Sequence, residues 1–251
     1  MNGTTPTSLP PMGFVAVDVH FTRVSGDAYN SDTWPFPLIR QEADGTSIPH
    51  LVTDAAYPSA FIDSFVAAAQ SLADKGAVGI MTSCGFLAMA QPEVAARVSV
   101  PVATSSLCQI PSIQAWLPRA KSVGVITFDA VKLTKGHLVN VGVARPEAVH
   151  IVGPPDNGAL KRLVRDGEVP YNHAGIEDEL VLCAQELVKE HPELGAIVLE
   201  CTQMAPFAEG IQKAVGLPVY DVYTLGCWFY EGLVRRRPER WGAINGVGPI
   251  A

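Results

Sequence analysis

The amino-acid sequence predicts an α/β fold built from two similar halves. Short apolar runs of strand length recur along the chain, segments with helical spacing lie between them, and two sets of motifs repeat. The apolar runs are rich in Val and Ile and mostly do not alternate with polar residues, which is typical of parallel strands buried on both faces. We therefore expect two pseudo-symmetric, Rossmann-like halves, each with a mainly parallel sheet flanked by helices.

Strand and helix candidates alternate along the chain. Apolar residues spaced three or four apart predict one helix over 61–72, ending at Gly76, and another over 176–188, stopping before Pro192. The strand candidates are the runs 13–20, 77–82, 100–104, 123–127, 148–152, 196–200 and 219–222.

The repeat relates the two halves to each other. Cys84 and Cys201 are separated by the same number of positions as Pro101 and Pro218, and each cysteine follows an apolar run. A second echo relates the segment that begins at Gly13 to the segment that begins at Gly124, because both are apolar and end near an Asp. We expect residues 1–113 and 224–251 to form the first half and residues 114–223 the second, with an active site in the cleft between them.

Composition excludes several classes of protein. Of the 251 residues, 48% are hydrophobic and 17% charged, which disfavours a disordered chain or a coiled coil. The formal charge is -7, and the basic residues cluster only at 235–237, so we expect no nucleic-acid or membrane partner. The most apolar stretch, 76–90, is too short and too interrupted to cross a membrane.

Cysteine usage and the N-terminal residues point to a reducing compartment. The five cysteines form an odd set without a Cys-x-x-Cys pair, which disfavours a disulfide framework and a zinc site. Residues 1–11 show no signal-peptide pattern, so we expect a cytoplasmic protein. The histidines show no ligand spacing, and nucleotide-binding glycine motifs are missing, so we expect neither a metal nor a cofactor. The sequence does not determine whether the protein forms a homo-oligomer.

Cys84 and Cys201 are the candidate catalytic residues. Each follows the carboxyl end of a predicted strand and precedes a helix, and ligands bind at that edge of a parallel sheet. A helix N-terminus there favours the thiolate. One cysteine as thiolate and the other as thiol, facing each other across a cleft, could remove a proton and return one on the opposite face. Taken singly, each cysteine could instead be a small buried apolar residue.

Polar residues near the cysteines could bind a substrate carboxylate. The candidates beside the cysteines are Ser83 and Gly85 in one half and Thr202 and Gln203 in the other. Candidates at other strand ends are Thr104, Ser105, Ser106 and Thr127, of which Ser105 or Ser106 could equally cap a helix.

The long connection over 21–58 is a further candidate. It contains four prolines, and a segment this long is typical of a lid or a functional loop, with a surface excursion as the alternative. Within it, Arg23 could clamp a carboxylate or be a plain surface residue.

Three motifs resemble the aspartate/glutamate racemase superfamily. They are IMTSCGFLA over 80–88, VPVATSSL over 100–107 and LECTQMAP over 199–206. The resemblance implies two α/β halves with an active site between them, no cofactor, and Cys84 and Cys201 as the two acid/base residues. The first motif and Gln203 depart from the glutamate racemase pattern, so glutamate is not implied as the substrate.

The resemblance leaves three functions open. The first is a cofactor-independent racemase or epimerase of a small carboxylate-bearing substrate, of the amino-acid or hydantoin type. The second is a cis-trans isomerase, or a lyase or decarboxylase, in which a cysteine acts as nucleophile. The third is a ligand-binding protein without catalysis, because a fold alone does not determine a function.

Overall fold

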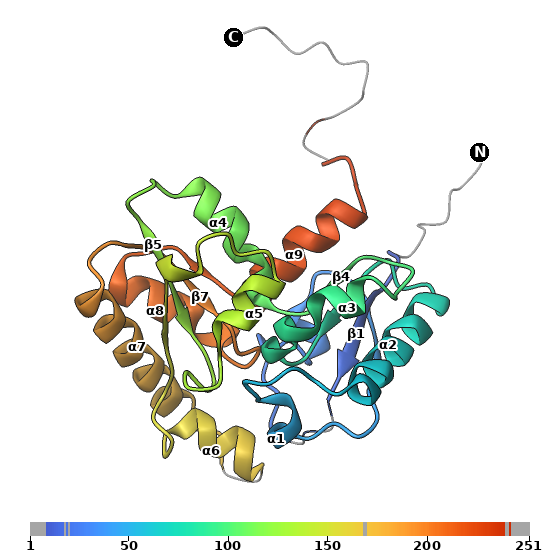
Figure 1. The fold of residues 1–251 in the computed structure, drawn as a ribbon, viewed down its shortest axis with the longest axis horizontal. Helices are drawn as coiled ribbons and strands as arrows, with labels where there is room; N and C mark the ends of the chain where they lie inside the picture. Colours follow the sequence, from blue (N-terminus) through green and yellow to red (C-terminus); the bar gives the residue numbers. More distant parts are fainter. Residues whose placement is uncertain (1–8, 18, 20, 168–169, 239–240, 242–251) are drawn as a thin grey trace, which may run out of the picture.

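Two four-stranded parallel sheets lie side by side in the computed structural model, which describes residues 9–17, 19, 21–167, 170–238 and 241 (Figure 1). The first sheet has the order β2-β1-β3-β4 and the second the order β6-β5-β7-β8, so the halves share one topology. This confirms the predicted fold class. The strands are β1 Met12–Ala16, β2 Leu38–Glu42, β3 Ile80–Thr82, β4 Val102–Ala103, β5 Ser122–Ile126, β6 Val149–Val152, β7 Leu194–Leu199 and β8 Val219–Tyr220.

The central strands are the apolar runs that the sequence indicates. Every residue of β1 and β5 is buried, because each strand has sheet neighbours on both sides and helices over its faces. Sequence patterns did not predict β2, which pairs in parallel with β1 from Met12 opposite Leu38 to Ala16 opposite Glu42. It is an edge strand of intermediate burial, so its LIRQE sequence lacks the apolar signal of a central strand.

The helices cover both sheets. The predicted helices exist as α2 Ser59–Asp74 and α7 His173–Glu190, and Gly76 follows α2 with a φ of 93°, which favours glycine. The other helices are α1 Ile48–Leu51, α3 Gln91–Ala95, α4 Ile110–Trp116, α5 Lys135–Asn140, α6 Ala159–Asp166, α8 Ala208–Val215 and α9 Val222–Leu233.

A shared core joins the halves. Phe86 and Leu107, which follow β3 and β4, pack in one apolar cluster with Val123, Val125 and Val198 of the second sheet. The chain then returns to the first sheet through α9, which lies between the sheets in Figure 1 and contributes to a cluster around β1. The carboxyl ends of β3 and β7 consequently meet at the junction of the two halves.

Two expectations concern parts of the chain outside the described residues. Residues 1–8, which show no signal-peptide pattern, lie before the described chain, and the C-terminal segment assigned to the first half runs through 242–251. Among the described residues, no helix combines the length and the apolar character needed to cross a membrane.

Candidate active site

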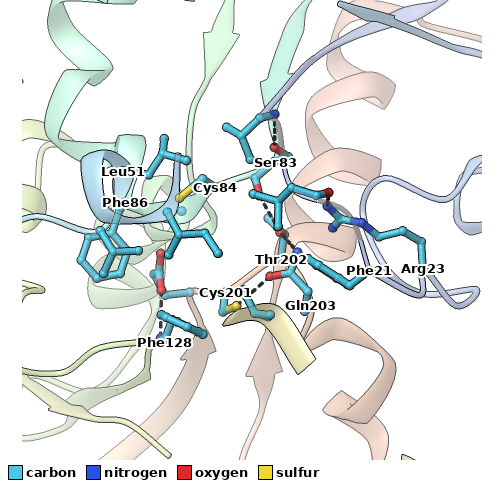
Figure 2. Close-up of a pocket in the computed structure, with 17 residues that line it drawn as sticks. Phe21, Arg23, Leu51, Ser83, Cys84, Phe86, Phe128, Cys201, Thr202 and Gln203 are labelled. Carbon is cyan, nitrogen blue, oxygen red and sulfur yellow. Dashed lines mark hydrogen bonds between the residues drawn. The ribbon is translucent and has the colours of Figure 1, made fainter. Parts of the chain in front are cut away.

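Cys84 and Cys201 line the same small cavity at the junction of the halves (Figure 2). Cys84 is the residue before the short 3-10 helix Gly85–Ala90 that follows β3, and Cys201 lies in the turn that follows β7. The cavity volume is about 50 Å³. One water takes about 10–15 Å³ by the same measure, so the cavity suits a small molecule. Its lining is completed by Val17, Val19, Phe21, Arg23, Ile48, Leu51, Val52, Ser83, Gly85, Phe86, Phe128, Val164, Glu200, Thr202 and Gln203.

Both thiols have raised pKa values and are therefore neutral, and they differ in their surroundings. Burial, and then the negative charge of Glu200, raise the pKa of Cys84 to about 12, while backbone hydrogen bonds from Phe86 and Leu87 oppose the rise. Burial and Glu200 also raise the pKa of Cys201. The Cys201 thiol donates to Gln203 Oε1 at 3.1 Å, which favours its protonated form. Cys84 is therefore the better placed to become a thiolate.

A chain of hydrogen bonds links Cys201 to the strand end that carries Cys84. Gln203 accepts from the Cys201 thiol, and its Nε2 donates to Thr202 Oγ1 at 2.7 Å. Thr202 Oγ1 in turn donates to the Ser83 carbonyl oxygen at 2.8 Å, and Ser83 Oγ accepts from the Val17 N–H at 3.0 Å. These bonds, drawn as dashed lines in Figure 2, hold the two cysteine turns together.

Glu200 is a buried carboxylate between the cysteine turns. It is 1% exposed, and its Oε2 accepts from Thr127 Oγ1 at 2.7 Å and from the Phe128 N–H at 3.3 Å. Its Oε1 accepts no hydrogen bond from the residues that the structure describes. Burial raises the pKa of Glu200 to about 7, although these two hydrogen bonds lower it. The carboxyl group thus titrates near neutral pH, in the range useful for acid/base work.

Gly85 has a steric reason to be glycine. A Cβ at this position would overlap both Glu200 Oε1 and the Glu200 carbonyl oxygen. The close approach keeps the Glu200 carboxyl group beside the turn that carries Cys84.

Arg23 is the cationic side chain in the cavity lining. Figure 2 shows it on one side of the two sulfurs and Phe86 and Phe128 on the other. Its Nη1 contacts both carboxylate oxygens of Asp27, at 3.3 and 3.4 Å, and its guanidinium lies 3.8 Å from the centre of the Phe21 ring. Arg23 is thus oriented by these contacts, as a carboxylate clamp requires.

Four of the predicted hydroxyl ligands lie behind the cavity instead of lining it. Thr104 Oγ1 contacts Gln91 Oε1 at 2.8 Å, and Ser105 Oγ caps the next helix by accepting from the Leu107 N–H. Ser106 Oγ donates to the Leu199 carbonyl oxygen at 2.7 Å, and Thr127 binds Glu200. Because these hydroxyls already bond within the protein, they support the cavity wall.

The long connection over 21–58 supplies much of the cavity wall. Besides Phe21 and Arg23, it contributes Ile48, Leu51 and Val52 from α1 and the residue after it. It acts as more than a surface excursion, because its apolar side chains form part of the cavity lining beside the cysteines.

Sequence patterns did not single out Glu200 or the aromatic wall. The one available signal for Glu200 was its position beside Cys201 in the repeated motif, where the first half has Ser83. In the sequence, Phe86 and Phe128 look like ordinary core residues. Their place in the cavity lining depends on how the two halves pack, which the sequence pattern does not show.

One cluster with metal-ligating side chains lies elsewhere. His150, His191 and Glu193 bring their ligand atoms within 4.8 Å of one another near the amino ends of β6 and β7, at the sheet end opposite Cys201. The two imidazole rings stack with centres 3.6 Å apart. Distant positions in the sequence supply the two rings, so spacing could not have predicted this cluster.

Comparison with known proteins gives a family and several relatives. The family model Asp/Glu/Hydantoin racemase matches residues 37–229. A dimethylsulfoniopropionate lyase of Durusdinium sp. clade D is 29% identical, and the match covers 89% of this chain and 75% of that protein. Dimethylsulfoniopropionate lyases 5 and 3 of Emiliania huxleyi are each 24% identical over 90% and 86% of this chain. The chain spans about half of these two relatives, 46% and 57% of their lengths.

Solved structures share the fold. Unliganded arylmalonate decarboxylase matches with a TM-score of 0.56 and 16% identity, covering 91% of this chain and 96% of that one. An aspartate racemase homologue from Pyrococcus horikoshii OT3 has a TM-score of 0.55 at 14% identity, covering 90% and 99% of the two chains. At identities this low, the similarity shows a shared fold and nothing about function.

Proposed function

Because the chain belongs to the Asp/Glu/Hydantoin racemase family, we propose that it removes a proton from the carbon next to a substrate carboxylate, without a cofactor. The observation that carries this proposal is that two cysteines from equivalent turns of the two halves line one cavity. Cys84 is the base, because backbone N–H groups meet its sulfur, and Cys201 is the acid, because it donates to Gln203. Arg23 binds the carboxylate.

The outcome that we propose is β-elimination, the reaction of a lyase. The cavity is small and mostly apolar, which suits a short carboxylate whose far end is methylated. The curated relatives named above are dimethylsulfoniopropionate lyases, and their substrate has this form. When the Cys84 thiolate takes the α proton, the C–H electrons form a carbon–carbon double bond. The bond from the β carbon to sulfur breaks, and its electrons leave with neutral dimethyl sulfide.

Racemisation or epimerisation is the second candidate. The equivalent placement of Cys84 and Cys201 favours it, because a pair of thiols can remove and return a proton on opposite faces of one carbon. The two outcomes make different demands on Cys201. Racemisation needs its proton in every turnover, whereas elimination of a neutral leaving group does not.

The test supplies dimethylsulfoniopropionate and follows dimethyl sulfide by gas chromatography. In parallel, single-enantiomer amino acids and hydantoins are incubated in deuterated water, and loss of the α-proton signal is followed by NMR. We expect dimethyl sulfide release that is abolished by Cys84→Ser and reduced by Cys201→Ser. Exchange of an amino acid or hydantoin that both variants abolish, without dimethyl sulfide, would establish the racemase instead.

A further inference from the structure

The buried Glu200 carboxylate has no cationic partner among the residues that the structure describes. None of the described residues forms an ion pair with it, and the cationic side chain of the cavity lining, Arg23, is already paired with Asp27. Burying a carboxylate without a counter-ion is costly, and proteins normally pair or neutralise such groups. The Glu200 side chain is nonetheless held in place by two donors to Oε2, whereas none of the described residues donates a hydrogen bond to Oε1.

The groups around Glu200 suit a methylated cation. Phe128 donates its backbone N–H to Glu200, and its ring lines the cavity together with that of Phe86. Aromatic faces attract cations that carry methyl groups and have no hydrogen to donate. Figure 2 places both rings on the side of the cysteines away from Arg23. The cavity therefore has a cationic side and an anionic, aromatic side.

We propose that Glu200, Phe86 and Phe128 form a subsite for the onium group of a zwitterionic substrate, whose carboxylate lies toward Arg23. This inference rests on the proposed function and specifies its substrate class: a carboxylate with a sulfonium or quaternary ammonium group two carbons away. The bound cation supplies a counter-ion for Glu200. It also offsets the negative charge that opposes ionisation of the Cys84 thiol, so the correct substrate assists formation of the base.

The titratable groups around the subsite determine its pH dependence. Cys84, Cys201 and Tyr57 interact electrostatically with Glu200, and burial raises the pKa of each of them, so all three are neutral near pH 7. Burial raises the pKa of Glu200 itself to about 7. Binding of an onium group should therefore weaken below this pH by up to about tenfold per pH unit, because a proton competes with the cation.

The experiment compares two unreactive probes of the same shape by isothermal titration calorimetry. One is 3-(trimethylammonio)propionate, and the other is 4,4-dimethylpentanoate, in which a neutral carbon replaces the ammonium nitrogen. At pH 8 we expect the wild-type protein to bind the onium probe at least about tenfold more tightly than the neutral probe. The preference should be lost at pH 5, and it should be lost at both pH values in Glu200→Gln.

Two further variants keep the test decisive. Thr127→Val removes a hydrogen bond that lowers the pKa of Glu200, so the loss of preference should begin at a higher pH. Glu179→Gln changes a carboxylate outside the cavity, which accepts from the Ala159 N–H, and should leave the preference unchanged. If Glu200→Gln does not fold, as judged by circular dichroism, Thr127→Val decides the question.

The inference is overturned if the wild-type protein binds both probes equally at pH 8, or binds neither. It is also overturned if folded Glu200→Gln keeps the preference, or if Thr127→Val leaves the pH dependence unmoved. None of these measurements requires turnover. A protein that prefers the onium probe but yields no dimethyl sulfide and no proton exchange would refute the proposed function and leave the subsite standing.

Discussion

At the scale of single residues, Gly85 shows how closely the two halves meet at the site. A methyl group there would collide with the backbone carbonyl oxygen of Glu200 as well as its carboxylate, and the backbone cannot move aside cheaply. We predict that Gly85→Ala lowers kcat/KM at least about tenfold and destabilises the protein by about 1–3 kcal/mol. Steady-state kinetics and urea unfolding measure the two effects.

Gly232→Ala is the matched control for Gly85→Ala. Gly232 lies in the last turn of α9, and nothing lies within 4 Å of a Cβ placed there. Alanine favours a helix over glycine by up to about 1 kcal/mol, so this variant should be as stable as the wild type or more stable. Equal activity of Gly85→Ala and Gly232→Ala would show that the contact with Glu200 does not matter.

Also at this scale, Glu200 makes stability depend on pH. Its carboxyl group has an ordinary pKa of 4.5 that the fold raises to about 7, so the folded state binds its proton more tightly than the unfolded state. Its contribution to the free energy of unfolding should therefore fall as pH rises from about 4.5 to 7, by about 3 kcal/mol, and then level off.

The measurement is urea unfolding of the wild type and of Glu200→Gln across this pH range. Asp27 and Asp221 also have raised pKa values and act in the same direction, whereas the lowered pKa of His137 acts in the opposite one. The difference between the two proteins isolates Glu200, since these other groups are common to both. A difference that does not change with pH would contradict the assignment of a near-neutral pKa to Glu200.

At the scale of elements, α1 depends on a few hydrogen bonds to stay over the cavity. The Tyr57 hydroxyl lies 2.7 Å from the Leu51 carbonyl oxygen and 3.1 Å from that of Phe86, and Lys132 Nζ donates to the Val52 carbonyl oxygen from the other half. Tyr57→Phe should cost about 1 kcal/mol of stability and raise KM several-fold, with a smaller effect on kcat, because the wall formed by α1 loosens.

Tyr171→Phe is the control for this prediction. Its hydroxyl pairs with His173 at an exposed position, so its removal should change neither stability nor KM. If Tyr57→Phe behaves like Tyr171→Phe in urea unfolding and in kinetics, α1 is held by its apolar contacts alone.

At the scale of the whole molecule, the halves should unfold together. The apolar cluster that contains Phe86, Leu107 and Val125 spans both sheets, and Thr202 and Ser106 donate to backbone oxygens across the junction. We predict that amides of β1 and of β5 exchange with solvent at the same free energy of opening, as measured by hydrogen exchange with mass spectrometry. A clearly lower value in one sheet would show two independently stable halves.

Much of this architecture could be predicted from the sequence, because local patterns of apolar residues indicate the strands and helices. Buried parallel strands need continuous apolar runs, so β1, β5 and β7 were visible, and helical spacing revealed α2 and α7. Strand β2 was not visible, because an edge strand faces partly toward solvent and its residues need not be apolar. The repeat also identified Cys84 and Cys201 as an equivalent pair.

By itself, then, the sequence determined the α/β class, the twofold repeat and the pair of cysteines. Each of these features follows from residues close together in the chain or from motifs that recur. The tertiary structure alone decided which residues share the cavity. It brought Glu200, Phe128 and the segment with α1 to the cysteines, and it placed Ser106 and Thr127 behind the wall. The physical reason is that these neighbours come from distant segments, and only the packing of the two halves sets the distances and burial that give their side chains a chemical role.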